Sequence, residues 1–266
     1  MNIKIPAKKN LNYIKKYFLN HKLNILFNKK NYNHNIKFQP NIPQQKIIPP
    51  DLNDLYYIHQ LILLNKRLTI LEFGSGWSSL ILLHALNLNK KKYTNKTNNL
   101  RIHELFQLYI LETSKKYLLN TKKRNSLFFS KSERKNINYF LSKIKMTTFN
   151  NRFCTEYLNL PIVNPDFIYL DGPSPYDVSN NIFGFTTAHP DMMPMASDIL
   201  KIENFLVPGT IILIDGRTAN TTFLLNNFQR KWKYFKLKFC DFHVLVLNDP
   251  PLGEHNKRQL KFYMEA

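Results

Sequence analysis

The residues best suited to chemistry lie in the segment Leu-Glu-Phe-Gly-Ser-Gly-Trp-Ser-Ser, residues 71–79. Gly74 and Gly76 allow a sharp backbone turn and leave room for a ligand where a side chain would stand. Glu72 precedes the first glycine by two residues, so we expect its carboxylate at the end of a strand, at the mouth of a crevice. A carboxylate there would repel a pyrophosphate and attract a cofactor with a positive centre. A plain strand–helix turn is the alternative, because Ser79 replaces the third glycine of G-x-G-x-x-G.

Glu112 ends the next apolar run, residues 107–112. In nucleotide-binding α/β domains an acid at this place accepts hydrogen bonds from ribose hydroxyls. The distance from Gly76 exceeds the usual separation of about 20 residues. An insertion over residues 89–105 would explain the difference, and Glu104 is the alternative acid.

Asp171 follows the buried run 167–170 and begins the turn Asp-Gly-Pro. Ligands of open α/β sheets bind outside the carboxyl ends of the strands, so Asp171 should lie near Glu72 and Gly74. A turn aspartate that caps its own loop is the alternative interpretation. The long segment 174–195 has the character of a substrate loop.

Two groups could remove a proton from a substrate: Asp171 and His189. For a lone histidine in a loop, a packing role is an equal alternative. The residues that could contact an acceptor substrate are Tyr176, Asp215, Arg217 and Asn220. Arg217 could instead pair with Asp171 or Asp215.

Alternating strands and helices must position these groups. Hydrophobic periodicity predicts strands at 68–72, 107–112, 127–129, 167–170 and 210–215, followed by a closing pair at 234–239 and 242–247. It predicts helices at 52–65, 77–87, 114–120, 136–144, 198–205 and 221–232, with Asp51 capping the first and Ser78 or Ser79 capping the second. The predicted fold is an α/β three-layer sandwich with a mostly parallel, seven-stranded, doubly wound sheet and an antiparallel edge strand.

Composition limits the class of protein. The 266 residues, 44% of them hydrophobic, suffice for one α/β domain, and no apolar run approaches the length of a membrane-spanning helix. Cys154 and Cys240 fit neither a disulfide framework nor a thiolate metal site. We therefore expect reduced, buried thiols and a reducing, cytoplasmic location.

The net charge of +20 favours a polyanionic partner, RNA or an anionic membrane surface, although an AT-rich genome would also enrich lysine. Residues 1–50 hold ten lysines and no acid. Leu11, Ile14, Phe18 and Ile25 predict a basic amphipathic helix within 9–28. It could dock on the domain, bind a surface as an arm, or serve as a transit peptide, for which it lacks Arg and Ser.

The division of the chain follows from proline and charge. Residues 1–50 are predicted as a basic extension with a Pro-rich linker at 38–50, residues 51–250 as the domain, and residues 251–266 as a tail. Residues 89–99 are predicted as an exposed loop or a phosphate-contacting patch. The basic cluster between 122 and 135 is predicted as a solvated face.

The phrases Leu-Glu-Phe-Gly-Ser-Gly-Trp-Ser-Ser, Pro-Asp-Phe-Ile-Tyr-Leu-Asp-Gly-Pro, His-Pro-Asp-Met-Met-Pro-Met-Ala-Ser-Asp-Ile-Leu and Pro-Gly-Thr-Ile-Ile-Leu-Ile-Asp-Gly-Arg-Thr-Ala-Asn together resemble the class I S-adenosylmethionine-dependent methyltransferases, in particular a poorly characterised group of small methyltransferase-like proteins. The resemblance covers about residues 51–248. It implies S-adenosylmethionine as cofactor, bound by the turn residues Glu72, Gly74, Ser75, Gly76 and Ser78, with Glu112 at the ribose and Asp171 close to the methyl donor.

The resemblance leaves the acceptor open. A small molecule or glycan methylated on oxygen or nitrogen is the first interpretation. An RNA- or ribosome-associated methyltransferase is the second, and a non-catalytic, nucleic-acid-binding relative is the third. Catechol-type enzymes bind a divalent metal at the strand ends that correspond to Asp171 and Asp215, but Gly216 stands where they usually have Asn. No metal is the first expectation, and Mg²⁺ or Ca²⁺ at the two aspartates is the alternative.

Overall fold

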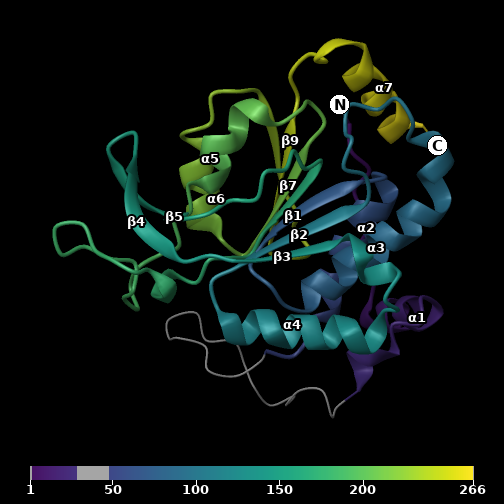
Figure 1. Cartoon of the computed structure of the whole chain (residues 1–266), viewed down its shortest axis with the longest axis horizontal. Coiled ribbons are helices and arrows are strands. Elements are labelled where there is room, and N and C mark those ends of the chain that lie inside the picture. Colours follow the sequence, from purple (N-terminus) through teal and green to yellow (C-terminus); the bar gives the residue numbers. More distant parts are fainter. Residues whose placement is uncertain (1, 29–47, 266) are drawn as a thin grey trace.

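A seven-stranded sheet forms the centre of the part of the chain that the computed structural model describes, residues 2–28 and 48–265 (Figure 1). Its strand order is β3-β2-β1-β6-β7-β9-β8. The strands of this sheet are β1 (Thr69–Phe73), β2 (Gln107–Glu112), β3 (Ile137–Leu141), β6 (Phe167–Leu170), β7 (Ile211–Asp215), β8 (Trp232–Lys236) and β9 (Phe242–Leu247).

In the sheet, β3, β2, β1, β6 and β7 are paired in parallel, and β9 runs antiparallel to both β7 and β8. The antiparallel strand therefore lies one place in from the edge, beside β8. The mostly parallel seven-stranded sheet with an antiparallel pair at one edge is confirmed. It has the strand order and directions of the class I methyltransferase fold that the sequence resemblance implies.

Helices cover both faces of the sheet (Figure 1). Ile70 packs with one face, and Leu71 and Phe73 pack with the other, because successive strand residues point to opposite sides. The first face carries α1 (Leu11–Asn20), η1 (Asn24–Phe27), α2 (Leu52–Leu64), α3 (Trp77–Tyr93) and α4 (Lys115–Phe128); the second carries α5 (Asp198–Ile202), η6 (Glu203–Phe205) and α6 (Thr218–Leu225). No helix in the described ranges is both long and apolar enough to cross a membrane.

The third strand and one helix were predicted in the wrong places. Residues 127–129 belong to the end of α4 and its C-cap, and residues 136–144, predicted as a helix, contain β3. The run Asn-Tyr-Phe-Leu is short and lies at the sheet edge, so it lacks the continuous apolar pattern of a central strand. The helix predicted at 221–232 begins earlier and ends earlier, as α6.

The exposed loop predicted at 89–99 is also wrong over its first half. α3 continues to Tyr93 and is followed by η3 (Thr94–Lys96). The Asn89 side chain is buried and donates hydrogen bonds to the backbone oxygens of Arg67 and Ile62. A polar residue thus holds the end of α3 in the core, which its residue type alone did not indicate.

The N-terminal segment folds onto the domain. α1 buries Ile14 and Phe18 completely, and Leu23 and Leu26 join the same cluster as α2 and α3. The predicted helix within 9–28 is therefore split into α1 and η1. The Pro-rich linker predicted at 38–50 lies mostly outside the described residues, which resume at residue 48.

Two elements were not predicted. A hairpin of β4 (Ile144–Phe149) and β5 (Arg152–Tyr157) follows β3 and projects from the domain (Figure 1). The predicted tail contains α7 (Gly253–Met264), which packs Phe262 and Tyr263 onto Leu68. Tyr263 donates a hydrogen bond to the buried Asp166 carboxylate at the amino end of the sheet.

A chain of histidines joins α1, α2 and α3. The Tyr17 hydroxyl is hydrogen-bonded to Nδ1 of His59, whose Nε2 lies 2.9 Å from Nδ1 of His84. Burial and the neighbouring His84 and His21 lower the pKa of His59 well below its ordinary value, and burial lowers the pKa of His84 to about 4. Two charged groups outside the chain of rings also act on the pKa of His84: Lys91 lowers it and Glu133 raises it.

We expect this histidine chain to make the domain sensitive to acid. The unfolded chain takes up protons at the ordinary histidine pKa of about 6.5, whereas the folded chain resists them. The stabilisation is therefore complete above about pH 6.5 and is lost as the pH falls towards 4. Urea unfolding measures this effect. Between these pH values the unfolding free energy of His84→Asn should fall less than that of wild type, while that of the exposed His189→Asn should fall as much as that of wild type. The same dependence of unfolding free energy on pH in all three proteins would contradict the expectation.

Candidate active site

The carboxyl ends of four neighbouring strands, β2, β1, β6 and β7, form one edge of the sheet and carry most of the predicted site residues. Backbone hydrogen bonds extend the ladder one residue past the strands: Gly74 N–H donates to Leu111 and Asp171 N–H donates to Phe73. Glu72, Gly74 and Asp171 are thereby brought together, as predicted from the crevice rule.

Gly74 and Gly172 touch through their backbones. Gly74 has φ of +97°, and a Cβ on Gly172 would lie 2.7 Å from the Gly74 nitrogen. A side chain at position 172 would therefore push the two turns apart. Gly172 was not singled out from the sequence, because the approach of two distant turns leaves no local signal there.

Gly76 has a different role from the one predicted. Its φ of −176° is extended, so the turn does not require glycine there, and a Cβ would meet only Ser78 Oγ at 3.9 Å. The position is open. Gly76 also caps α3, and its N–H donates to Ser79 Oγ, so the helix begins one residue before the predicted serine caps.

Glu72 is completely buried beneath this turn rather than open at the crevice mouth. Ser78 Oγ and Ser79 Oγ donate to its two oxygens at 2.5 and 2.6 Å. Burial raises the pKa of Glu72 to about 8, against the opposing effect of the two hydroxyls. Glu72 and Ser78 therefore fix the turn onto the first residues of α3.

Glu112 lies at the end of β2 against the glycine turn. One of its carboxylate oxygens accepts hydrogen bonds from the N–H groups of Thr113 and Ser114 at 2.8 and 2.9 Å. The other accepts from Ser75 Oγ at 2.6 Å. The carboxylate is thus held in one orientation, and its second oxygen meets a hydroxyl that can rotate away for a ligand. Glu104, the alternative acid, lies before β2 and accepts from Tyr109 OH.

Asp171 and Asp215 end adjacent strands, β6 and β7. Asp171 has solvent-exposed surface, although neighbouring protein groups displace water from around its carboxyl. This desolvation and the neighbouring Asp215 carboxylate raise the pKa of Asp171 well above its ordinary value, and the Arg217 cation opposes them. Burial raises the pKa of Asp215 to about 6, although Tyr169 OH donates to this carboxylate at 2.7 Å.

Buried polar atoms in this region lack protein partners. Arg217 donates from one terminal nitrogen to the Pro173 oxygen, but its Nε is buried without a hydrogen bond. Within the described residues Arg217 forms no ion pair with Asp171 or Asp215. The buried Tyr157 hydroxyl is also unpartnered, and the charges of Glu112 and Arg217 act on it. Such atoms are costly unless a ligand or water satisfies them.

Acidic residues gather at this edge of a strongly basic protein. The chain has 18 Asp and Glu against 38 Lys and Arg. Nine of the 18 influence one another's pKa, or act together on the pKa of Tyr157: Asp51, Asp54, Glu72, Glu112, Asp171, Asp177, Asp198, Asp215 and Asp241. Burial and mutual proximity raise the pKa values of several of these groups, and a ligand with positive charge would stabilise their ionised forms, so the crevice is suited to such a ligand.

The remaining predicted residues lie around this centre in different ways. Tyr176 lies in η5 (Pro175–Asp177), which is tied to β2 by the hydrogen bond from Thr113 Oγ1 to Asp177. Asn220 is fully buried, and its amide accepts a hydrogen bond from the Ala196 N–H and donates one to the Ala196 oxygen, so it ties α6 to the segment before α5. The His189 ring lies on an exposed loop beside Asp191, with 55% of its side chain exposed.

Arg124 is a site residue that the sequence did not reveal. It lies on α4, within the basic cluster predicted as a solvated face. Its guanidinium donates to the Gly76 oxygen at 2.8 Å and stacks over the Trp77 ring, with 4.0 Å from its central carbon to the ring centroid. Burial lowers its pKa to about 10, while Glu72 opposes the shift. Arg124 thus anchors the glycine turn to α4.

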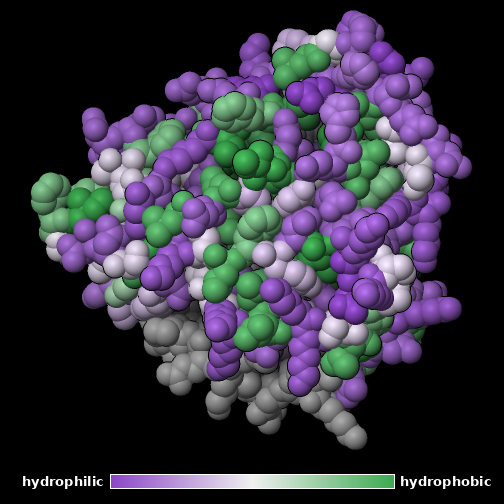
Figure 2. All heavy atoms as spheres, in the orientation of Figure 1, coloured by the Kyte–Doolittle hydropathy of each residue, from purple (hydrophilic) through white to green (hydrophobic). Residues whose placement is uncertain are grey.

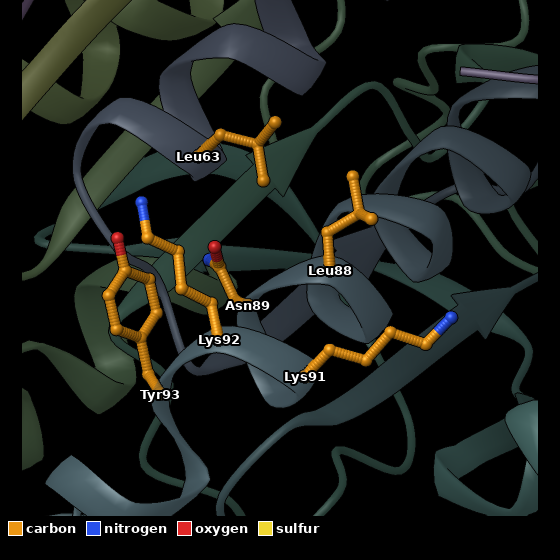
Figure 3. Close-up of a pocket in the computed structure, with 6 residues that line it drawn as sticks. All are labelled: Leu63, Leu88, Asn89, Lys91, Lys92 and Tyr93. Atoms are coloured by element: carbon orange, nitrogen blue, oxygen red, sulfur yellow. The ribbon is translucent and has the colours of Figure 1, made fainter.

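A surface hollow of about 410 Å³ lies away from this edge, at the end of α3. Its lining residues are Leu63, Leu88, Asn89, Lys91, Lys92 and Tyr93, none of which was predicted for the site (Figure 3). Figure 3 shows Lys91 extending away from Tyr93 while Lys92 runs beside its ring. The two lysines point apart beside an apolar wall, so they do not form a catalytic arrangement. The strand-end crevice therefore remains the candidate active site. In the described ranges no group of three or more His, Cys, Asp or Glu is arranged to hold a metal.

Comparison with known proteins gives structural similarity alone. No family model and no curated protein sequence matches the chain. A putative caffeoyl-CoA O-methyltransferase from Staphylococcus aureus is similar over 90% of this chain and 100% of that one, with a TM-score of 0.45 and 12% identity. An O-methyltransferase from Bacillus cereus in complex with SAH is similar over 92% and 93%, with a TM-score of 0.43 and 13% identity.

Human methyltransferase-like protein 13, in complex with SAH, is similar over 76% of this chain and 81% of that one, with a TM-score of 0.35 and 14% identity. At these scores and identities, the chemistry of the site must come from the residues of this chain.

We expect Gly172→Ala to destabilise the domain by about 2–4 kcal/mol, because the new Cβ meets the Gly74 backbone and neither turn can yield by moving a side chain. Gly76→Ala is the matched control in the same pair of turns and should unfold within about 1 kcal/mol of wild type. Chemical denaturation measures both. A Gly172→Ala protein as stable as wild type would show that the contact is dispensable.

We expect Glu72→Gln to gain stability relative to wild type as the pH rises. The folded state holds a proton on Glu72 up to about pH 8, whereas the unfolded state releases it near its ordinary pKa of about 4.3. The stabilisation from this proton is complete below about pH 4.3 and is lost as the pH rises through about 8. Unfolding free energies across this range, with the exposed Glu254→Gln as control, measure the effect. A difference independent of pH would exclude a protonated Glu72.

Proposed function

We propose that the protein is an S-adenosylmethionine-dependent methyltransferase that acts on an oxygen or nitrogen nucleophile of a small molecule or glycan. The observation that carries the proposal is the concentration of carboxylates around a glycine turn, at the carboxyl edge of a methyltransferase-type sheet. A sulfonium and an amino group are the charges that such a crevice attracts.

The residues fit this cofactor. Glu112 offers an oriented carboxylate oxygen that can accept from ribose hydroxyls when the Ser75 hydroxyl turns away. Gly76 leaves open space at the start of α3, and the turn that contains it is fixed by Glu72 and Arg124. The unpartnered Arg217 Nε and Tyr157 hydroxyl are donors that protein groups leave unsatisfied.

S-adenosylmethionine supplies an electrophilic methyl group on a sulfonium. The chain must align the acceptor with that group, take up the proton that the acceptor releases, and limit water. Asp171 is the group best placed to hold the proton, because its raised pKa makes it a stronger base than an ordinary aspartate. Arg217 and Tyr157 can orient a polar acceptor beside it. We retain Asp171 as the base and set His189 aside, since the His189 ring contacts Asp191 on an exposed loop.

Calorimetric titration of the full chain with S-adenosylmethionine tests the proposal. Wild type should bind in the micromolar range, and Glu112→Gln should bind about 10–100-fold more weakly, since it loses hydrogen bonds to a charged acceptor. Glu104→Gln is the matched control, because Glu104 stands before the same strand, at its opposite end, and should leave affinity unchanged.

The absence of binding to wild type at millimolar cofactor would refute the proposal. Equal losses of affinity in the Glu112 and Glu104 variants would be compatible with cofactor binding but would show that Glu112 does not contact the cofactor.

A further inference from the structure

The outer face of α4 carries a second hollow, separate from the crevice. Its volume is about 330 Å³, and it is lined by Lys122, Lys123, Ser126, Arg134 and Tyr139. Three of these side chains are cationic, one is a hydroxyl, and Tyr139 supplies an aromatic wall over which Lys122 lies at 4.9 Å. The Ser126 hydroxyl donates to the Lys123 oxygen and Arg134 Nε donates to the Phe129 oxygen, so the two lysine ammonium groups and the terminal nitrogens of Arg134 are the donors that suit a phosphate group.

Within residues 2–28 and 48–265, the cations of this hollow are not neutralised by an ion pair. α4 contains four lysines, one arginine and no acid. None of the ion pairs formed by the described residues involves Lys122, Lys123 or Arg134. The nearest acid in the chain, Glu133, accepts hydrogen bonds from Ser130 instead. The surface is therefore left with a positive potential that an external anion can neutralise.

Two leucines stand on the same face. Leu119 is 53% exposed and Leu127 is 71% exposed. Residues three or four apart are neighbours on a helix, so Leu119 borders Lys122 and Lys123, and Lys123 borders Leu127. Figure 2 shows hydrophobic side chains standing among hydrophilic ones over α4. The face thus combines phosphate-binding groups with apolar side chains that the domain does not cover.

We infer that this face of α4 is a docking surface for an anionic lipid bilayer, in which the hollow holds a phospholipid phosphate and Leu119 and Leu127 enter the boundary of the acyl chains. At a membrane interface lysine heads stay at the phosphate level while apolar side chains are buried. A nucleic acid would use the cations equally, but its phosphates would leave both leucines exposed. The exposed leucines therefore favour the lipid surface. The inference is independent of the proposed methyl transfer.

Co-sedimentation of the full chain with vesicles tests this surface. The protein should bind vesicles of phosphatidylcholine mixed with phosphatidic acid and should not bind phosphatidylcholine alone. The triple variant Lys122→Gln, Lys123→Gln, Arg134→Gln should lower the partition coefficient on the order of 100-fold, since each basic group near an anionic surface contributes several-fold. The matched control is the triple variant Lys257→Gln, Arg258→Gln, Lys261→Gln, which removes the same number of charges from the exposed face of α7 and should have a much smaller effect.

The double variant Leu119→Ser, Leu127→Ser separates the two kinds of polyanion. It should lower vesicle binding about tenfold and leave binding to a single-stranded RNA oligonucleotide unchanged. Melting temperatures near that of wild type show that the exposed substitutions leave the fold intact. Three results would overturn the inference: binding to phosphatidylcholine alone, equal losses for the α4 and α7 triple variants, or RNA binding that depends on the α4 cations while vesicle binding ignores the leucines.

Discussion

The backbone contact between Gly74 and Gly172 fixes the geometry on which the rest of the site depends. It brings the ends of β1 and β6 together without side chains between them, so the crevice has a floor made of main chain. Asp171 precedes one glycine and the open position Gly76 follows the other, which places a titratable carboxyl beside the space where a ligand can lie. The hydrogen bonds from Ser78 and Ser79 to Glu72 then hold the turn against the start of α3.

Charge is distributed according to the same sheet. Carboxylates gather where the parallel strands end. Burial raises the pKa values of Asp171 and Asp215, and neighbouring carboxylates add to the shift: Asp215 acts on Asp171, and Asp241 and Asp51 act on Asp215. Most lysines of the described residues are exposed, on helices as well as on strands and loops, where water solvates them. The net charge of +20 therefore describes the outer surface rather than the crevice, where acidic residues gather. Function at the crevice and attraction of polyanions can thus coexist in one small domain.

The sequence predicted the elements whose signals are local. The strands that end at Glu112 and Asp215 are buried and apolar, so their limits were nearly correct, and Asp51 caps α2 as expected. β3 was missed because an edge strand lacks a continuous apolar run. Gly172 and Arg124 could not be identified as site residues, because each acts through a partner far away in the chain. Tyr157 was missed because it ends β5, a strand that the sequence did not predict. Asn220 was predicted from its position to contact a substrate, whereas in the structure it is fully buried and hydrogen-bonded to the Ala196 backbone.

α4 connects the two surfaces. Arg124 faces inward, where it holds the Gly76 oxygen and covers Trp77, while Lys122 and Lys123, its immediate neighbours in the chain, line the outer hollow. A helix that rests on a phosphate surface by its outer lysines therefore carries, on its inner side, the guanidinium that anchors the glycine turn. The Glu72 carboxyl also raises the pKa of Arg124, so an electrostatic interaction accompanies the hydrogen bond that holds the glycine turn. α4 also packs against α3, β2 and β3, so Arg124 is the charged contact among several that hold the glycine turn in position.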